Sequence, residues 1–475
     1  MEKIKICKIK QFIKRNMLGF IIGGIIFGTV GVSAAIIMSA NEISYKDTTL
    51  QNTLDDLYAK AKKVTGNSKC ESVAKPVLKD GLIPVTIADN GTVTAVSQDD
   101  SNWYNYCEKK WANAVILSSG SYTAGQTIPE SAIETYLVWI PKYKYQLWNI
   151  SQTAEKKAHS INVVFDTVNT TDGTGTCATP MTSGNSGNCH NGDFMTHPAF
   201  ISMNVNGFWV GKFETGYKGA TSTSAAQVNA NDSSRIIVKP NSYSWRNSTV
   251  MNMFLSAYNY KRDMNSHMMK NTEWGAVAYL SHSKYGIDYE VNINNNSSYK
   301  TGYSSLLTIQ QGTYTGTYGD GASYNKAYNT STGYLASTTG NISGVYDMAG
   351  GAHEYMASYS VVGSSGFNAT TIAQYDAKYF DQYNASSGEQ TYQYRILGDA
   401  TGEMGPFVDY KDGDANSRHH NQWYGDNSYF VQSSNPWFLR GGGYADGVLA
   451  GQFHFARNTG GADTRFGSRL VLAAN

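Results

Sequence analysis

The chain of 475 residues has little charge, few cysteines and no basic cluster beyond its first sixteen residues. Charged residues make up 16% of the chain, and its formal net charge is +1. The leader over residues 1–16 holds six basic residues and one Glu, a charge of +5, which leaves −4 for the remainder. The remainder therefore lacks the clustered Lys and Arg that phosphate binding needs. None of the five cysteines has the close Cys-x-x-Cys spacing usual in zinc sites. These absences argue against a nucleic-acid-binding protein and a structural zinc site.

Tyrosine and glycine, in contrast, are abundant. The chain has 34 Tyr and 47 Gly with only 9 Pro, and 41% of its residues are hydrophobic. A real core is therefore expected, and the length allows two or three domains. The composition predicts short strands, long loops and an aromatic surface more than a bundle of long helices. Tyrosine suits binding surfaces, but it also fills strands for packing reasons.

An uncharged, mostly apolar segment over residues 17–40 follows the basic leader. It is long enough to cross a bilayer as a helix, and the positive flank places the N-terminus inside and the remainder outside. We expect a single-pass anchor in the cell membrane with an extracellular C-terminal domain. The small residues Val32–Ala34 also fit a signal-peptidase site, so a cleaved leader and a secreted protein are the alternative.

Residues 41–65 predict an amphipathic helix or stalk. Leu50, Leu54, Leu57 and Ala61 stand at helical spacing within this segment. Their apolar face either packs on the following domain or mediates self-association.

Four cysteines follow the predicted anchor, where oxidation is permitted. They are Cys70, Cys107, Cys177 and Cys189. Four cysteines allow three pairings, and proximity in sequence favours Cys70 with Cys107 and Cys177 with Cys189. Cys7, in the cytoplasmic leader, is expected to be reduced.

Residues 66–134 give short, mixed signals, and we assign them to a small extracellular segment before a main domain over 135–475. In the main domain, Thr135–Leu147 predicts two strands separated by a break at a proline, and Gly207–Thr215 predicts another strand.

Two helices are expected next, over Thr249–Tyr258 and Lys270–Leu280. Residues 281–341 are largely Gly, Ser, Thr, Asn and Tyr, which predicts long surface loops more than a core.

The last forty residues predict a glycine corner that feeds a strand. Three consecutive glycines, Gly441–Gly443, allow close backbone approach and positive φ, and an alternating run follows. Phe453 and Phe455 should face one side of this strand, and Gln452 and His454 the other. Polar groups on an outer face are available to a ligand, but an ordinary half-buried terminal strand is the competing interpretation.

The run Gly344–Tyr355, Gly-Val-Tyr-Asp-Met-Ala-Gly-Gly-Ala-His-Glu-Tyr, resembles a signature of the formylglycine-generating enzyme (sulfatase-modifying factor) family. Five further blocks follow the family's order: Leu137–Pro141, Phe208–Thr215, Asn271–Ala278, Arg440–Tyr444 and Gly467–Arg469. The resemblance covers about residues 135–475. It implies an α+β, C-type-lectin-like (sulfatase-modifying-factor-like) domain with short strands, a few helices and long loops.

The resemblance does not extend to the family's catalytic chemistry. In the family, two active-site thiols follow the block that matches Arg440–Tyr444, and those positions hold Asp446 and Gly451 here. No cysteine occurs after Cys189. Neither Asp nor Gly replaces a soft, oxidisable sulfur, so we do not expect an enzyme. A divergent oxidoreductase of the formylglycine-generating type is the alternative.

The family's signature block also implies a calcium site. Its ligands carry over to the carboxylates of Asp347 and Glu354 and the carbonyls of Gly350 and Ala352. Hard oxygen ligands suit Ca²⁺, but a plain turn held by hydrogen bonds is an equal alternative.

The terminus from Gly441 to Leu472 is similar to the C-terminal segment of variable proteins targeted by diversity-generating retroelements. That similarity implies a scaffold of apolar residues with changeable residues between them. The expected scaffold residues are Trp437, Phe453, Phe455, Leu470 and Leu472.

Together these observations predict a membrane-anchored, surface-displayed binding protein for a carbohydrate or protein ligand, with a passive structural subunit as a further alternative. The predicted ligand-binding residues are Tyr444, Asp446, Leu449, Gln452, His454, Arg457, Asn458, Asp463 and Arg465.

Overall fold

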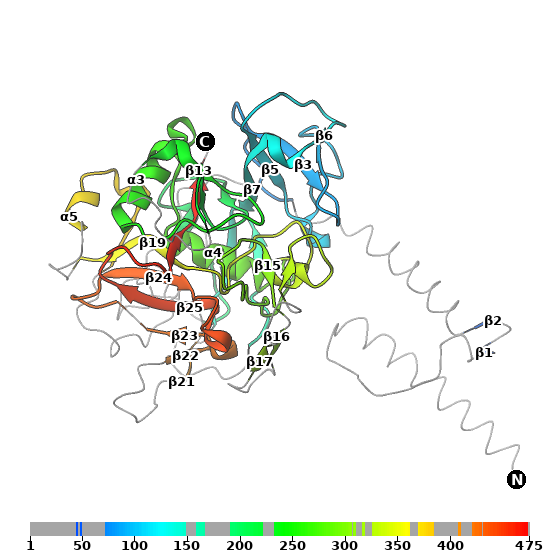
Figure 1. Cartoon of the computed structure of the whole chain (residues 1–475). Helices are drawn as coiled ribbons and strands as arrows, with labels where there is room; N and C mark the ends of the chain where they lie inside the picture. Colours follow the sequence, from blue (N-terminus) through cyan, green and yellow to red (C-terminus); the bar gives the residue numbers. More distant parts are fainter. Residues whose placement is uncertain are drawn as a thin grey trace, which may run out of the picture. The chain divides into compact units, whose positions relative to one another are not determined.

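A computed structural model describes residues 72–148, 158–166, 191–221, 232–305, 325–361, 369–383, 423–429 and 431–473, and the backbone of six short strands outside these ranges. The chain divides into two compact units, Met1–Lys69 and Cys70–Asn475. In the first unit the structure describes only β1 (Ser44–Tyr45) and β2 (Thr48–Thr49), which pair antiparallel. Figure 1 shows the whole chain.

The predicted anchor over residues 17–40 lies outside the described residues, as does most of the helix expected over 41–65. Where that helix was expected to begin, Thr48–Thr49 is a strand, in keeping with the β preference of threonine. No helix in the described ranges is long and apolar enough to cross a membrane.

The second unit is built on two large sheets, so its class is α+β and strand-rich, as predicted. The first sheet has the order β14-β27-β11-β7-β5-β3-β4-β6, and all its neighbouring strands are antiparallel. Its strands are β3 (Ile83–Ile87), β4 (Val93–Ala95), β5 (Asn113–Leu117), β6 (Thr127–Ile128), β7 (Ile133–Pro141), β11 (Gly207–Gly211), β14 (His267–Met268) and β27 (Leu470–Leu472).

The small segment assigned to residues 66–134 is not separate from the main domain. Strands β3 to β6 come from it, and β5 pairs with β7 along Asn113–Leu117. Since these strands share one sheet with β7 and β11, the predicted boundary at 134/135 is wrong.

The second sheet is mixed and carries the C-terminal segment. Its order is β20-β19-β24-β25-β23-β22-β21, with β26 also pairing β19. Its strands are β19 (His353–Ser360), β20 (Asp381–Tyr383), β21 (Phe407–Asp409), β22 (His420–Gln422), β23 (Asn427–Ser428), β24 (Trp437–Gly441), β25 (Gly451–Asn458) and β26 (Phe466–Ser468). In Figure 1, β24 and β25 are the orange pair beneath β19.

Smaller sheets and short helices connect these two. One sheet has the order β10-β8-β9, and three pairs are β12–β13, β15–β18 and β16–β17. Their bounds are β8 (Tyr143–Gln146), β9 (Val163–Phe165), β10 (Phe194–Thr196), β12 (Gly216–Tyr217), β13 (Ile236–Ile237), β15 (Tyr303–Ser304), β16 (Leu307–Ile309), β17 (Gly316–Tyr318) and β18 (Lys326–Ala327). The α-helices are α3 (Val250–Tyr260), α4 (Asn271–Ser281) and α5 (Ala369–Ile372). The 3-10 helices are η2 (Tyr106–Glu108), η3 (Glu130–Ala132), η4 (Pro198–Phe200), η5 (Ser233–Arg235), η6 (Arg262–Met264), η8 (Gly333–Ala336), η9 (Ala377–Tyr379), η10 (Trp423–Gly425) and η11 (Gly447–Leu449).

The predicted strands and helices of the main domain are confirmed, with shifted ends. Pro141 closes β7 before β8 begins, as a proline without an N–H donor should. Helix α3 begins after Thr249, whose side chain accepts a hydrogen bond from Asn252 N (3.2 Å). The strand expected over Gly207–Thr215 ends at Gly211.

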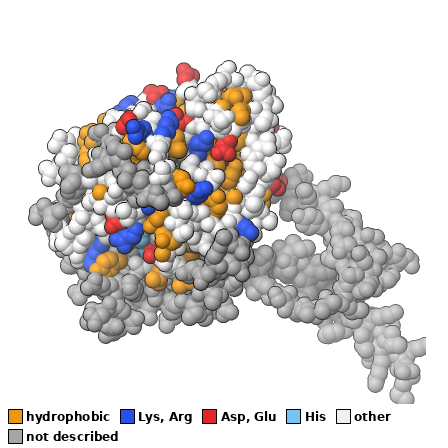
Figure 2. All heavy atoms as spheres, in the orientation of Figure 1, with side chains coloured by type: hydrophobic (Ala, Val, Ile, Leu, Met, Phe, Trp, Pro, Cys, Tyr) orange, Lys and Arg blue, Asp and Glu red, His pale blue; other side chains and the backbone are white. Residues whose placement is uncertain are grey.

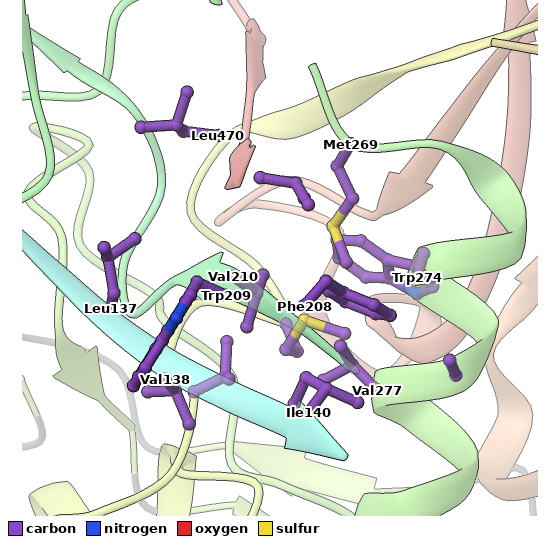
Figure 3. Packing of buried hydrophobic residues seen from close by; sticks show 14 of the residues in the cluster. Leu137, Val138, Ile140, Phe208, Trp209, Val210, Met269, Trp274, Val277 and Leu470 are labelled. Carbon is purple, nitrogen blue, oxygen red and sulfur yellow. The ribbon is translucent and has the colours of Figure 1, made fainter. Parts of the chain in front are cut away.

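Helix α4 lies at the centre of the core. Every residue of it is buried, which is typical of a helix enclosed on all sides. Trp274 donates to the carbonyl of Gln452 in β25 (2.8 Å), and Tyr143 of β8 donates to the carbonyl of Ala276 (2.7 Å). Figure 3 shows side chains of α4, β7, β11 and β27 gathered in this core. The C-terminal sheet is therefore fixed on a rigid interior.

Residues 282–302, between α4 and β15, form loops, as expected, but much of this segment is buried and is not a surface loop. Val291 and Ile293 are buried, and so are polar residues such as Asn292 and Thr301. Hydrogen bonds make this burial possible: Asn292 donates to the carbonyl of Ser305 (2.6 Å), and Thr301 donates to that of Lys239 (2.6 Å). The prediction of exposed loops is thus wrong for this part of 281–341.

Candidate functional site

The glycine corner forms where it was predicted. Gly441 and Gly442 have φ of 81° and 75°, a region that favours glycine. A Cβ on Gly442 would lie 2.7 Å from the Cα of Ala450, so the corner also needs close backbone approach. The chain then passes through η11 before β25 begins at Gly451. The corner therefore projects a short helical turn from the end of the second sheet.

The outer face predicted for β25 does not exist. Gln452 and His454 are each only 2% exposed, so the prediction that they face a ligand directly is wrong. The side chain of Gln452 donates to the Ser281 hydroxyl of α4 (2.8 Å). Because α4 lies against this strand, both of its faces are covered.

Seven of the predicted ligand-binding residues reach the surface at least in part, and five of these lie at the corner and at the loop before β26. Leu449 and Arg465 are exposed, and Tyr444, Asp446 and Asp463 are half-buried. Asp463 accepts three hydrogen bonds from Arg465, one from its backbone N–H (2.9 Å) and two from its guanidinium (3.0 and 2.9 Å).

The two segments meet at the start of β19. The backbone N–H of His353 donates to the carbonyl of Arg465 (3.0 Å), and its ring lies 3.1 Å from Asp446 (Nε2 to Oδ2). We call the surface made by Tyr299, His353, Tyr444, Asp446, Leu449, Asp463 and Arg465 the terminal face.

Tyr299 belongs to this face, although no signal in the sequence pointed to it. Its φ is 56°, a region that costs a bulky residue about 1 kcal/mol or more. Its ring meets that of Tyr444 edge-on, with centroids 4.8 Å apart, and the guanidinium of Arg246 lies 3.7 Å from the Tyr299 ring centroid. Strained residues held by their surroundings cluster at functional sites.

Arg457 and Asn458 lie elsewhere on β25. They follow His454 by three and four residues, which is roughly 10 and 13 Å along a strand. Arg457 lies over the ring of Tyr429 at 3.7 Å, and Asn458 accepts a hydrogen bond from the Tyr355 hydroxyl (2.7 Å). The structure thus gives them packing roles away from the terminal face.

His353 and Asp446 of the terminal face form a cluster of candidate metal ligands with the buried His454. One candidate ligand atom from each lies within 4.8 Å of the others. Nδ1 of His454 lies 2.8 Å from the carbonyl oxygen of Leu449, and the N–H of Gly443 donates to Oδ2 of Asp446 (2.8 Å). Nε2 of His454 and Nδ1 of His353 are buried without a hydrogen-bond partner in the described part of the chain. An unpaired buried nitrogen costs about 1–3 kcal/mol.

The charges of this cluster are set by burial and proximity. Burial lowers the pKa of His454 to about 3, with a further contribution from His353, so its ring is neutral at pH 7. Burial acts to raise the pKa of Asp446, but the hydrogen bond and charge of His353 hold that pKa well below its usual range. The neutral ring of His454 and the ionised carboxylate of Asp446 are in the state that metal ligation requires, whereas a metal ion would have to displace the proton that His353 donates to Asp446.

The residues of the predicted calcium site are engaged in other contacts. Glu354 is paired with Arg469, whose Nε donates to its carboxylate at 3.0 Å. Asp347 accepts hydrogen bonds from the side chain of Asn294 (2.9 Å) and the backbone of Gly302 (2.8 Å). These hydrogen bonds engage carboxylate oxygens that the predicted Ca²⁺ site would use.

The two remaining predicted calcium ligands lie in the turn beside those carboxylates. Gly350 has φ of 75° and donates to the carbonyl of Gly441 (3.0 Å), and Ala352 donates to Glu214 (2.9 Å). Glu214 is fully buried and also accepts a hydrogen bond from Ser244. Burial, and then the charges of neighbouring carboxylates, raise the pKa of Glu214 well above its usual range. The contacts are those of the alternative interpretation, a turn held by hydrogen bonds, and calcium stays a prediction.

A buried carboxyl pair lies on the other side of β25. Asp426 accepts a hydrogen bond from Phe453 N (2.8 Å), and burial raises its pKa to about 7. Burial, and then Asp426, raise the pKa of Glu290 well above its usual range. A Cβ on Gly451 would lie 2.0 Å from Oδ1 of Asp426. The position that matches the family's second thiol therefore has no room for a side chain.

A cavity of about 320 Å³ lies away from the terminal face, between β3, β5 and residues 341–343. Its polar side chains serve the fold: Trp111 donates to the carbonyl of Tyr285 (2.8 Å), and Asn113 to that of Ser343 (2.8 Å). These contacts give no argument for a ligand there.

Cys107 is disulfide-bonded, as expected. Cys70, Cys177 and Cys189 lie outside the described residues, so both predicted pairings stay predictions.

No family model matches this chain, and no curated protein matches it either. The resemblances to the formylglycine-generating enzyme family and to retroelement-diversified proteins thus stay predictions.

Proposed function

We propose that this protein is a membrane-anchored, surface-displayed binding protein of C-type-lectin-like fold that recognises a carbohydrate or protein ligand through the terminal face. The observation that carries this proposal is the terminal face itself: aromatic, aliphatic and charged side chains from four separate segments meet at the surface of a sheet whose core strands are buried.

The chemistry of the terminal face suits recognition. Leu449 is 37% exposed and is one of five large hydrophobic side chains exposed in the described ranges. Tyr299 and Tyr444 add aromatic rings, and Asp463 and Arg465 add a charged pair. Aromatic stacking beside carboxylate hydrogen bonding suits sugars, and the same set suits a protein epitope.

The surface charge is consistent with this function. On the face shown in Figure 2, basic and acidic side chains are interspersed among polar and hydrophobic atoms. A broad basic surface of the kind that binds nucleic acid is not seen on the described atoms of that face.

The division between scaffold and surface supports membership among diversified variable proteins. The five predicted scaffold residues, Trp437, Phe453, Phe455, Leu470 and Leu472, are all buried. Exposed residues of the terminal face lie in η11 and in the loop before β26, where side chains can change without disturbing the core.

The alternative of a divergent oxidoreductase has one observation in its favour, the His353–Asp446–His454 cluster. The closed position at Gly451 argues against a second thiol there. We therefore infer a binding protein and not an oxidase of the thiol-dependent type.

The test is a screen of the full-length chain, displayed on cells, against arrays of glycans and surface proteins. For any ligand found, Leu449→Ser is expected to weaken binding tenfold or more, because serine lacks the apolar surface that Leu449 would bury against the ligand. Leu335→Ser, a change of an exposed leucine in η8, is the matched control and should bind as the unchanged chain does. Equal binding by both variants would remove the terminal face from the proposal.

A further inference from the structure

We propose that His353, Asp446 and His454 bind one divalent first-row transition metal ion of the Zn²⁺, Fe²⁺ or Mn²⁺ class at the terminal face. This goes beyond ligand recognition and can be measured without knowing the ligand.

The three side chains come from three separate elements, and each is held in place. His353 begins β19, Asp446 precedes η11, and His454 lies within β25. The Gly443 N–H fixes the Asp446 carboxylate through a hydrogen bond of 2.8 Å. The Leu449 carbonyl, 2.8 Å from Nδ1 of His454, places the proton on that nitrogen and leaves the lone pair on Nε2. A backbone carbonyl bound to the second ring nitrogen is the usual support of a metal-ligating histidine.

The spacing of the ligand atoms fits a metal. Bonds of about 2.0–2.1 Å to nitrogen and oxygen place neighbouring ligand atoms about 3.0–3.4 Å apart. Nε2 of His353 and Oδ2 of Asp446 stand 3.1 Å apart as a hydrogen-bonded pair, and a bound metal ion would replace the proton between them. The cluster as a whole spans 4.8 Å, so a small closure of the side chains completes the set.

A buried nitrogen without a hydrogen-bond partner supports the metal site independently of that spacing. His454 is almost wholly buried, its ring centroid lies 5.4 Å from that of His353, and its Nε2 has no hydrogen-bond partner within the described ranges. A metal ion supplies the partner that this nitrogen lacks.

The ligand types select the class of metal. Two imidazoles and one carboxylate suit Zn²⁺, Fe²⁺ and Mn²⁺, whereas Ca²⁺ prefers an all-oxygen shell. The side chains of His353 and Asp446 are 14% and 33% exposed, so the site opens toward the terminal face. Three protein ligands leave at least one coordination position for water or for a donor atom of a bound ligand.

The experiment titrates the purified full-length chain, first stripped with a chelator, with Zn²⁺ alone by calorimetry and with Co²⁺ alone by visible absorption. We expect one equivalent bound with a micromolar or lower Kd, and a Co²⁺ spectrum of nitrogen and oxygen ligands without sulfur charge transfer. The midpoint of thermal unfolding should rise with metal, because the ion binds only the folded chain.

The decisive variants are His353→Gln and Asp446→Asn, since both residues are partly exposed and tolerate substitution better than His454. Each variant should bind the metal ion at least tenfold more weakly, and added metal should no longer raise its melting temperature. His159→Gln, a change of an exposed histidine, is the matched control and should bind normally. The proposal would be overturned if the chain showed no saturable metal binding, or if both variants still bound one equivalent of metal with unchanged affinity.

The outcome is separable from that of the proposed function. A chain that binds metal but no arrayed ligand contradicts only the recognition role. A chain that binds a ligand with unchanged affinity after chelation, and takes up no Zn²⁺, contradicts only the metal site.

Discussion

Replacing Gly451 by alanine should destabilise the second unit strongly, although the change adds a single methyl group. The new Cβ would lie 2.0 and 2.1 Å from the two carboxylate oxygens of Asp426. The φ of Gly451 is not in the left-handed region, so the backbone itself accepts alanine. The clash with Asp426 is therefore the whole of the effect.

The expected loss of stability follows from the contacts that the Asp426 carboxyl must break to make room for the new methyl group. Moving its carboxyl breaks the hydrogen bond from Phe453 N, which costs about 1.5–3 kcal/mol for a charged acceptor. Forcing an extra methyl into a packed site costs about 1–3 kcal/mol more. The free energy of unfolding should fall by roughly 2.5–6 kcal/mol, a large share of the 5–15 kcal/mol typical of a domain.

Urea unfolding of the full-length chain, followed by tryptophan fluorescence, measures this change. Gly461→Ala is the matched control, because its nearest atom is Thr459 Oγ1 at 3.5 Å and it should cost less than about 1 kcal/mol. The double variant Gly451→Ala with Asp426→Ala should lose less stability than the two single variants together, by about 1 kcal/mol or more in the free energy of unfolding. Equal stability of Gly451→Ala and Gly461→Ala would refute the steric reasoning, and with it the argument that this position excludes a thiol.

Three further predictions concern buried charge and the disulfides. The pKa of Asp426 is about 7 in the folded chain and near 3.8 in the unfolded chain, so this group lowers the free energy of unfolding by up to about 4 kcal/mol as pH rises from 4 to 7. Asp426→Asn should therefore flatten this part of the stability profile, measured by urea unfolding at each pH. Parallel profiles for the variant and the unchanged chain would contradict the assignment. Arg469→Met should lower the free energy of unfolding by about 3–5 kcal/mol, because it leaves the Glu354 carboxylate buried and unpaired. A loss below about 1 kcal/mol would show that the ion pair is dispensable. Peptide mapping without reduction should find Cys70 joined to Cys107 and Cys177 to Cys189, and a crossed pairing would show proximity in sequence to be a poor guide here.

Local patterns in the sequence were sufficient for the elements at the centre of the main domain. The alternation of apolar residues and the position of Pro141 predicted β7 and β8, and the apolar run after Lys270 predicted α4. The glycine corner was also predictable, because only positive φ and close approach explain three glycines together.

The errors came from contacts between distant parts of the chain. Residues 281–305 are polar in sequence, yet long-range hydrogen bonds such as that from Thr301 to Lys239 allow their burial. The alternation of side chains in β25 was clear from the sequence, but nothing in the local sequence indicated that α4 would cover Gln452. Likewise β5 gave only a short signal, and its pairing with β7 is a tertiary contact.

The candidate site was predicted in part for the same reason. Tyr444, Asp446 and Leu449 follow the corner directly, so their position at the surface could be inferred from the turn. The cluster with His353 could not, because its histidines lie 101 residues apart and meet only through the pairing of β19, β24 and β25.

The most direct test of the terminal face compares two equivalent ion pairs on the same chain. Arg465 and Arg235 are both exposed, and each pairs with an aspartate close in sequence, Asp463 and Asp232. If the terminal face binds the ligand, Arg465→Ala will lower the affinity of the displayed full-length chain for its array-selected ligand tenfold or more, and Arg235→Ala will leave it unchanged. Equal affinities for the two variants would contradict the assignment of the binding surface.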